Sequence, residues 1–117
     1  MAALTLQHFP GAQGASLPYY GDHRDVFIGD TVSSTKDDQD KPITSGFFRV
    51  EKGGKATATY TYFEVKFIVD GVLIVSDDSG QKVKAVKGDV LYFPKGATIT
   101  FETEEGGVAF FVNVSTF

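Results

Sequence analysis

The chain has 117 residues, a length typical of one domain, with 42% hydrophobic and 22% charged residues and a net charge of −4. No run of Lys or Arg forms a phosphate-binding stripe, and the absence of cysteine excludes disulfides, thiolate nucleophiles and cysteine metal sites. No stretch resembles a secretory signal or a membrane span, so we expect a cytoplasmic protein without nucleic-acid or membrane partners. Eleven Phe and five Tyr favour β-structure.

Residues 1–43 form the less regular part of the chain. Pro and Gly interrupt its first half, and residues 25–30 predict one short apolar strand between turn residues. Residues 33–42 are polar and end in a proline, which indicates an exposed loop before the next strand.

From residue 44 onward, apolar and β-branched stretches alternate with turns rich in Gly and Asp. We expect two strands with a bend within residues 55–70. Such signals recur about every ten residues without a helical period, which is typical of an all-β sandwich or barrel. The other predicted strands cover residues 46–51, 72–76, 81–86, 90–93, 97–102 and 108–114.

Two spaced motifs lie within this β-rich part. Six residues separate Glu64 from Gly71, and five residues separate Gly88 from a Pro-Lys-Gly turn at 94–96. In this order, the motifs resemble those of the RmlC-like cupin superfamily, and Tyr62 is placed as in its ethanolamine-utilisation type. The resemblance implies a single all-β cupin domain over residues 1–117, a jelly-roll-like double-stranded β-helix barrel. Its N-terminal strands and loop would occupy 1–43 and its barrel motifs 44–114.

The chain departs from the family pattern at the positions of the metal-binding histidines. Transition metals need several N, O or S ligands in fixed geometry, and of the family's set only Glu64 is present, so we expect no metal and no cofactor. His8 and His23 lie outside the motifs and are predicted to be surface residues. The residues at the family's histidine and asparagine positions are Thr57 and Thr59 (Ala58 and Tyr60 with the shorter family spacing), Ile99 and Thr103.

A polar set on one predicted strand provides the candidate chemistry. Alternation in a strand places Tyr62, Glu64 and Lys66 on the same face. The resemblance implies that Glu64 points into the barrel, where a carboxylate, an ammonium and a phenol together can perform acid–base catalysis. We therefore predict Glu64, Tyr62 and Lys66 as catalytic residues. The alternative is that Glu64 and Lys66 form an ion pair that only holds the barrel mouth.

A second set of residues is predicted to contact a substrate, although each member also has a structural interpretation. Alternation favours an outward position for Arg49, and Tyr92 and Asn113 can simply satisfy backbone groups. Threonine is common in strands, and the Phe residues fit a core and a subunit contact as well as an apolar cavity. The predicted contact residues are Arg49, Thr57, Thr59, Tyr60, Tyr92, Ile99, Phe101 and Asn113.

Two classes of function fit these observations. The first is a metal-independent isomerase, lyase, dehydratase or cyclase for a small organic molecule. In it Glu64 would act as acid or base, and Tyr62 or Tyr60 would donate a hydrogen bond to an oxygen. The alternative is a non-catalytic cupin that binds a small ligand or serves as a metabolic accessory protein. The resemblance also implies a homodimer, in which the strand around residues 26–28 adds to a partner's sheet.

Overall fold

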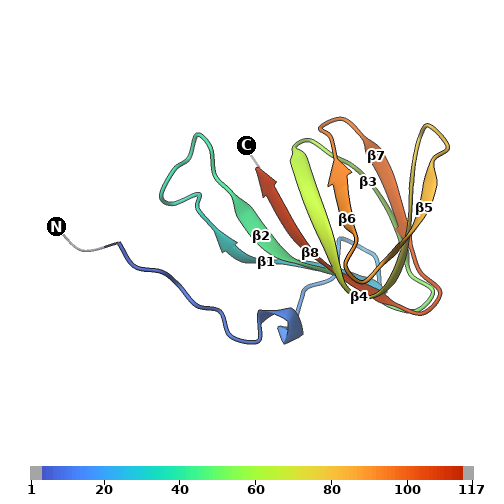
Figure 1. The fold of residues 1–117 in the computed structure, drawn as a ribbon, viewed down its shortest axis with the longest axis horizontal. Helices are drawn as coiled ribbons and strands as arrows, with labels where there is room; N and C mark the ends of the chain where they lie inside the picture. Colours follow the sequence, from blue (N-terminus) through green and yellow to red (C-terminus); the bar gives the residue numbers. More distant parts are fainter. Residues whose placement is uncertain (1–3, 115–117) are drawn as a thin grey trace.

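The computed structural model describes residues 4–114, whose eight strands curl into an antiparallel half-barrel (Figure 1). The all-β prediction is confirmed. The described residues contain no helix with the length and hydropathy required to span a bilayer. The elements are a 3₁₀ turn, η1 (Ala12–Gly14), and strands β1 (Val26–Ser33), β2 (Thr44–Val50), β3 (Lys55–Thr59), β4 (Phe63–Asp77), β5 (Lys82–Val86), β6 (Val90–Phe93), β7 (Thr98–Glu102) and β8 (Gly107–Val114).

Strand β4 belongs to both halves of the barrel. Its first half pairs with β8 on one side and β6 on the other, and its second half pairs with β7 and β5. The main strand order is β1-β2-β8-β4-β7-β3. The hydrophobic core lies inside the curl and receives side chains from all eight strands. Because β4 runs through both halves of the barrel, its register determines which side chains of the two halves come into contact.

The change of partners within β4 occurs at Gly71, the glycine that closes the first motif. Gly71 has a φ of 68°, and a Cβ at this position would clash with the carbonyl oxygen of Gly106 and lie 2.9 Å from the Cα of Gly107. The sequence predicted separate strands on the two sides of Gly71. In the structure one strand continues through it, because Val72 N donates to Gly106 O at 3.0 Å and keeps the chain paired.

The first half of β4 has the reverse of the usual alternation for a half-exposed sheet. Ordinarily the apolar side chains face the core and the polar ones face water. Here the charged side chains face inward, and the outward side chains are apolar and between 40% and 52% exposed. Both the site and the outer surface described below follow from this reversal. The inward residues are Glu64, Lys66 and Ile68, and the outward ones are Phe63, Val65 and Phe67.

Strand β1 forms the edge of its sheet and pairs with β2 of the same chain. Part of its other side is covered, because Ile28 N donates to Pro18 O and Tyr20 N donates to Val26 O. The predicted addition of residues 26–28 to a partner's sheet would require these hydrogen bonds to break.

We predict that Gly71→Ala destabilises the fold more than Gly80→Ala. Both glycines have a positive φ, so both substitutions carry backbone strain of about 1–3 kcal/mol. A Cβ at Gly80 meets nothing within 4 Å, whereas a Cβ at Gly71 meets the backbone of β8. Equilibrium urea unfolding measures the difference, and equal losses for the two variants would show that the close approach at Gly71 is unimportant.

Candidate acid–base site

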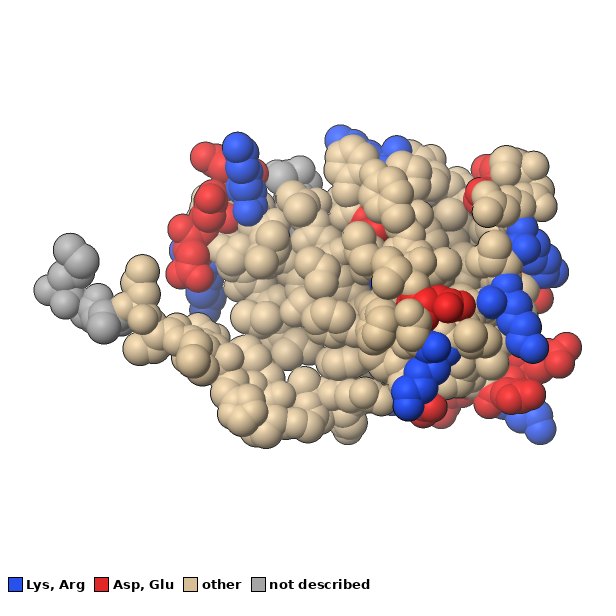
Figure 2. All heavy atoms as spheres, viewed as in Figure 1, with Lys and Arg blue, Asp and Glu red and all other residues tan. Residues whose placement is uncertain are grey.

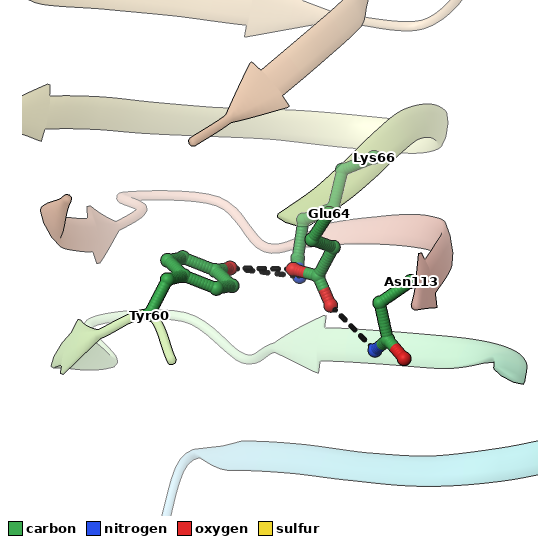
Figure 3. Close-up of polar contacts among 4 residues, drawn as sticks. All are labelled: Tyr60, Glu64, Lys66 and Asn113. Atoms are coloured by element: carbon green, nitrogen blue, oxygen red, sulfur yellow. Dashed lines mark hydrogen bonds and ion pairs between the residues drawn. The ribbon is translucent and has the colours of Figure 1, made fainter. Parts of the chain in front are cut away.

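Four polar side chains meet inside the barrel (Figure 3). Glu64 and Lys66 lie two residues apart on the inward face of β4. Asn113 pairs directly with Glu64 in the ladder between β8 and β4, so its side chain lies on the same face. Tyr60 lies between β3 and β4, where Tyr60 N donates to Ala97 O at 2.8 Å. Three separate segments thus position one cluster.

The carboxylate of Glu64 is the centre of this cluster. Its Oε2 accepts hydrogen bonds from the Tyr60 hydroxyl and from Lys66 Nζ, both at 2.5 Å. Its Oε1 accepts one from Asn113 Nδ2 at 3.1 Å, and Lys66 Nζ also lies 3.3 Å from the Tyr60 hydroxyl oxygen. Glu64 and Lys66 are only 2% and 1% exposed. A pair this deeply buried is maintained only when both charges are matched and hydrogen-bonded.

Aromatic rings enclose the ammonium of Lys66. The faces of such rings attract a cation that lies within about 6 Å of the ring centre. These contacts partly replace the water that the ammonium loses on burial. The rings belong to Phe48, Tyr60, Phe93, Phe101 and Phe111, with Nζ-to-centroid distances from 4.7 to 5.9 Å.

Burial shifts the proton affinities of the groups around Glu64. Desolvation lowers the pKa of Lys66, and the charge of Glu64 opposes this shift. Desolvation raises the pKa of Tyr60, and the nearby Glu64 carboxylate raises it further. Burial and then Glu64 raise the pKa of Tyr62 to about 12. At neutral pH both phenols therefore stay protonated and act as hydrogen-bond donors, while Lys66 releases its proton more readily than an ordinary lysine.

A cavity of about 90 Å³ adjoins the cluster and gives it chemical access. Its walls include Glu64, Lys66, Tyr60 and Tyr62, with Tyr20 from the segment before β1. Tyr60 is held in place because its ring stacks on Phe93 at 5.1 Å and meets Tyr62 edge-on at 5.6 Å. Ligand sites usually measure about 300–1,000 Å³, so this one has room for a molecule of only a few heavy atoms.

The structure brings most of the predicted polar residues together but changes the role of one. Glu64, Lys66 and Asn113 are in the cluster. Tyr62 borders the cavity, yet Tyr60 makes the hydrogen bond to Glu64. Phe101 is in the ring cage and Ile99 is in the core beside it.

Other predicted contact residues lie outside the site. The hydroxyls of Thr57 and Thr59 hydrogen-bond across the outer face of β3 and β7, to Thr100 and Thr98, each at 2.8 Å. Thr59 borders the cavity, but its hydroxyl is not directed into it. Arg49 lies over the Phe27 ring at 4.5 Å on the outer face, and Tyr92 is 61% exposed. Outward strand alternation explains all four positions.

Some lining residues were not predicted from the sequence. Tyr20 and Ile28 line the cavity from the segment before β1 and from β1 itself, and no local pattern indicates this long-range contact. Phe48, Phe93 and Phe111 contact Lys66, although the sequence identifies such residues only as core. The sequence signal for these three Phe residues was their position in strands of alternating apolar residues.

The donors present do not fit a metal ion of the cupin type. The inward positions of β3 are Ala56 and Ala58, and Tyr60, just after the strand, also points inward. This selects the shorter of the two family spacings and replaces the histidine pair with Ala58 and Tyr60. The third histidine position is the buried Ile99. Residues 4–114 contain no group of three His, Cys, Asp or Glu side chains arranged to hold a metal. A cationic ammonium, not an additional ligand, lies against Glu64.

Comparison with known proteins connects the chain to a described family. The family of EutQ-like cupin domains matches residues 38–109. The chain belongs to the EutQ-like cupin family. In this member of the family, a lysine lies beside the motif glutamate. No match was found among curated proteins.

Solved structures show the same fold. An ethanolamine utilization protein Q from Salmonella typhimurium LT2 is 22% identical, with a TM-score of 0.73 over 86% of this chain and 80% of that chain. The EutQ protein of Clostridium difficile is 24% identical, with a TM-score of 0.66 over 78% and 69%. A Rhizobium leguminosarum protein of unknown function is 25% identical, with a TM-score of 0.72 over 95% and 98%.

We predict that Glu64 and Lys66 are strongly coupled in stability. Lys66→Met leaves a buried carboxylate without its cation and should lower the free energy of unfolding by about 3–5 kcal/mol. The double variant Lys66→Met, Glu64→Gln removes both charges and should recover much of that loss. Guanidinium unfolding of the two single variants and the double variant measures the coupling. Additive losses would contradict the buried pair.

Proposed function

We propose that this EutQ-like cupin is a cytoplasmic, metal-independent acid–base enzyme for a very small oxygen-bearing molecule, of the isomerase, lyase, dehydratase or cyclase type. The observation that supports this proposal best is the convergence of a phenol and an ammonium on one oxygen of a buried carboxylate beside a cavity. A proton acceptor and two proton donors in a water-poor site are the parts that such reactions need.

The geometry supports a specific division of roles. Glu64 would take a proton from the substrate, since it is the only carboxylate that residues 4–114 contribute to the cavity wall. Once Glu64 has taken the proton and lost its charge, the Tyr60 hydroxyl would transfer its hydrogen bond from Glu64 to the substrate oxygen. There the hydroxyl and the Lys66 ammonium would stabilise the developing negative charge. Return of the proton to a different atom gives isomerisation, whereas loss of a leaving group gives elimination. Tyr60 and Lys66 thus act by positioning and charge.

Solved structures with this fold include a lyase and a synthase. The DMSP lyase DddQ of Ruegeria pomeroyi is 15% identical, with a TM-score of 0.59 over 62% of this chain and 38% of that chain. The ectoine synthase of P. lautus is 8% identical, with a TM-score of 0.75 over 97% and 80%. At these identities the likeness concerns the fold alone, so the proposed activity is based on the cluster around Glu64.

The second candidate function is a non-catalytic cupin that binds a small ligand. The specific observation in its favour is the small cavity, about 90 Å³, combined with three hydrogen bonds that already satisfy the Glu64 carboxylate. A ligand would have to replace one of these bonds. Binding without turnover is the outcome that would select this candidate.

The test is a search for binding and conversion with the EDTA-treated full chain. A panel of small hydroxy, oxo and carboxylic acids is incubated with the protein, and NMR follows both ligand contact and product. We expect one chemical class to be converted, with loss of conversion by about 10²-fold or more in Glu64→Gln, the range for a removed acid–base group. Tyr92→Phe, which changes an exposed hydroxyl, is the matched control and should convert normally.

Other outcomes of this search reject the proposal in distinguishable ways. Binding that Glu64→Gln abolishes, without product from the wild-type chain, selects the binding protein. Conversion that EDTA abolishes and a metal ion restores contradicts the metal-independent mechanism. Equal conversion by wild type and Glu64→Gln, with unchanged melting temperature, removes Glu64 from the reaction.

A further inference from the structure

Lys66 differs from every other lysine of the chain in its surroundings. Its side chain is 1% exposed and lines the cavity of about 90 Å³. The other lysines are all exposed, and several are among the blue side chains at the surface in Figure 2. In the proposed function Lys66 acts only through its charge and position. A lysine amine in an apolar pocket is also a nucleophile once it has lost a proton.

A proton acceptor for this amine is already in place. Oε2 of Glu64 lies 2.5 Å from Lys66 Nζ. Transfer of a proton between them converts two buried charges into two neutral groups, which desolvation favours because it penalises both charged forms. Desolvation also lowers the pKa of Lys66, so its amine is free of the extra proton more often than that of an ordinary lysine.

The hydroxyl of Tyr60 completes a place for one carbonyl group. Its oxygen lies 3.3 Å from Lys66 Nζ. At this separation the carbon of a C=O group can approach Nζ while the carbonyl oxygen accepts a hydrogen bond from the hydroxyl. A water molecule takes up about 30 Å³ of the liquid, so a cavity of about 90 Å³ admits only a short carbon chain behind this carbonyl.

We propose that Lys66 captures a short-chain aldehyde as an iminium ion, a covalent activity that goes beyond the proposed function. The ammonium gives one proton to Glu64, and the lone pair of Nζ adds to the carbonyl carbon while the π electrons move to oxygen. A second proton passes from nitrogen to that oxygen. Glu64 then returns its proton to the new hydroxyl group, which leaves as water while the C=N bond forms. One ammonium and one aldehyde thus give one iminium and one water, without oxidation or reduction.

The charge balance at the site favours an aldehyde over an acylating molecule. The iminium nitrogen carries the same single positive charge as the ammonium, so the ion pair with Glu64 and the contacts with ring faces such as that of Phe48 are retained. Acylation of Lys66 would remove this charge and leave a buried carboxylate without its cation, which is strongly destabilising. The water-poor interior also favours the iminium, because its formation releases water.

Reductive trapping followed by peptide mapping tests this inference. The full chain is incubated near neutral pH with propanal and cyanoborohydride, which reduces an iminium to a stable propylamine. We expect Lys66 to be propylated about tenfold faster than the exposed lysines or more, since each unit by which a lysine pKa is lowered raises the fraction of free amine about tenfold. Benzaldehyde, which is too bulky for the cavity, should react with the exposed lysines but not with Lys66.

A matched pair of variants tests the cavity as the route to the amine. Ala58→Leu keeps Lys66 and places a larger side chain in the cavity wall, so it should slow propylation of Lys66 by about tenfold or more. Thr57→Leu makes a similar change at the neighbouring exposed position of β3, and Lys66 should react in it as in the wild type. The exposed lysines provide the internal reference in each sample.

Three results would overturn the inference. One is propylation of Lys66 in the wild-type chain that is no faster than that of the exposed lysines. Another is equal reaction of Lys66 with propanal and benzaldehyde, and these two measurements need no variant to fold. The third is equal propylation of Lys66 in Ala58→Leu and Thr57→Leu. Because trapping requires no turnover, a negative result leaves the conversion test of the acid–base enzyme unaffected, and a failed conversion test leaves the trapping result unaffected.

Discussion

A carboxylate and an ammonium face each other at 2.5 Å in the interior of the half-barrel, and the rest of the structure is arranged around them. Removing two such groups from water costs several kcal/mol per ion unless charge, hydrogen bonds and polarisable surroundings compensate. Here Tyr60 and Asn113 complete the hydrogen bonds of Glu64, while ring faces surround Lys66. The pair is therefore costly to bury and specific in geometry, which is what an acid–base site requires.

The inward position of this pair also explains why the outer face of the sheet is apolar. A strand has two faces, so a strand that turns Glu64 and Lys66 inward must turn the residues that alternate with them outward. Those residues are Val65 and its apolar neighbours Phe63 and Phe67. One reversed strand thus places two charged side chains in the interior and an apolar stretch on the outer surface. The acid–base site and the apolar outer surface beside it have a common origin in the sequence of β4.

Much of this arrangement could be predicted from the sequence. The spaced motifs identified the cupin fold, and alternation correctly placed Glu64 and Lys66 on one face. Gly71 was recognised as the end of a motif, but its role is to let β4 continue past a close approach to β8, and this depends on a distant segment.

The choice between the tyrosines could not be made in advance. Alternation along a single strand places Tyr60 and Tyr62 on the same face as Glu64 and does not distinguish them. In the structure β4 begins only at Phe63, and Tyr60 reaches Glu64 from the preceding turn. The outward position of Thr57 similarly depends on the register of β3 against β7. Contacts made by Tyr20 join segments far apart in the chain, and no local pattern encodes them.

The pKa of Lys66 is the quantity that tests the central claim most directly. Lysine Nζ and Cε resonances, followed by NMR over a pH titration, report it in the wild-type chain and in Glu64→Gln. Burial should place it below the ordinary value of 10.5, and Glu64→Gln should lower it further, because the carboxylate is the group that opposes the shift. A Lys66 that titrates like an exposed lysine in both proteins would contradict the buried pair on which the proposed mechanism depends.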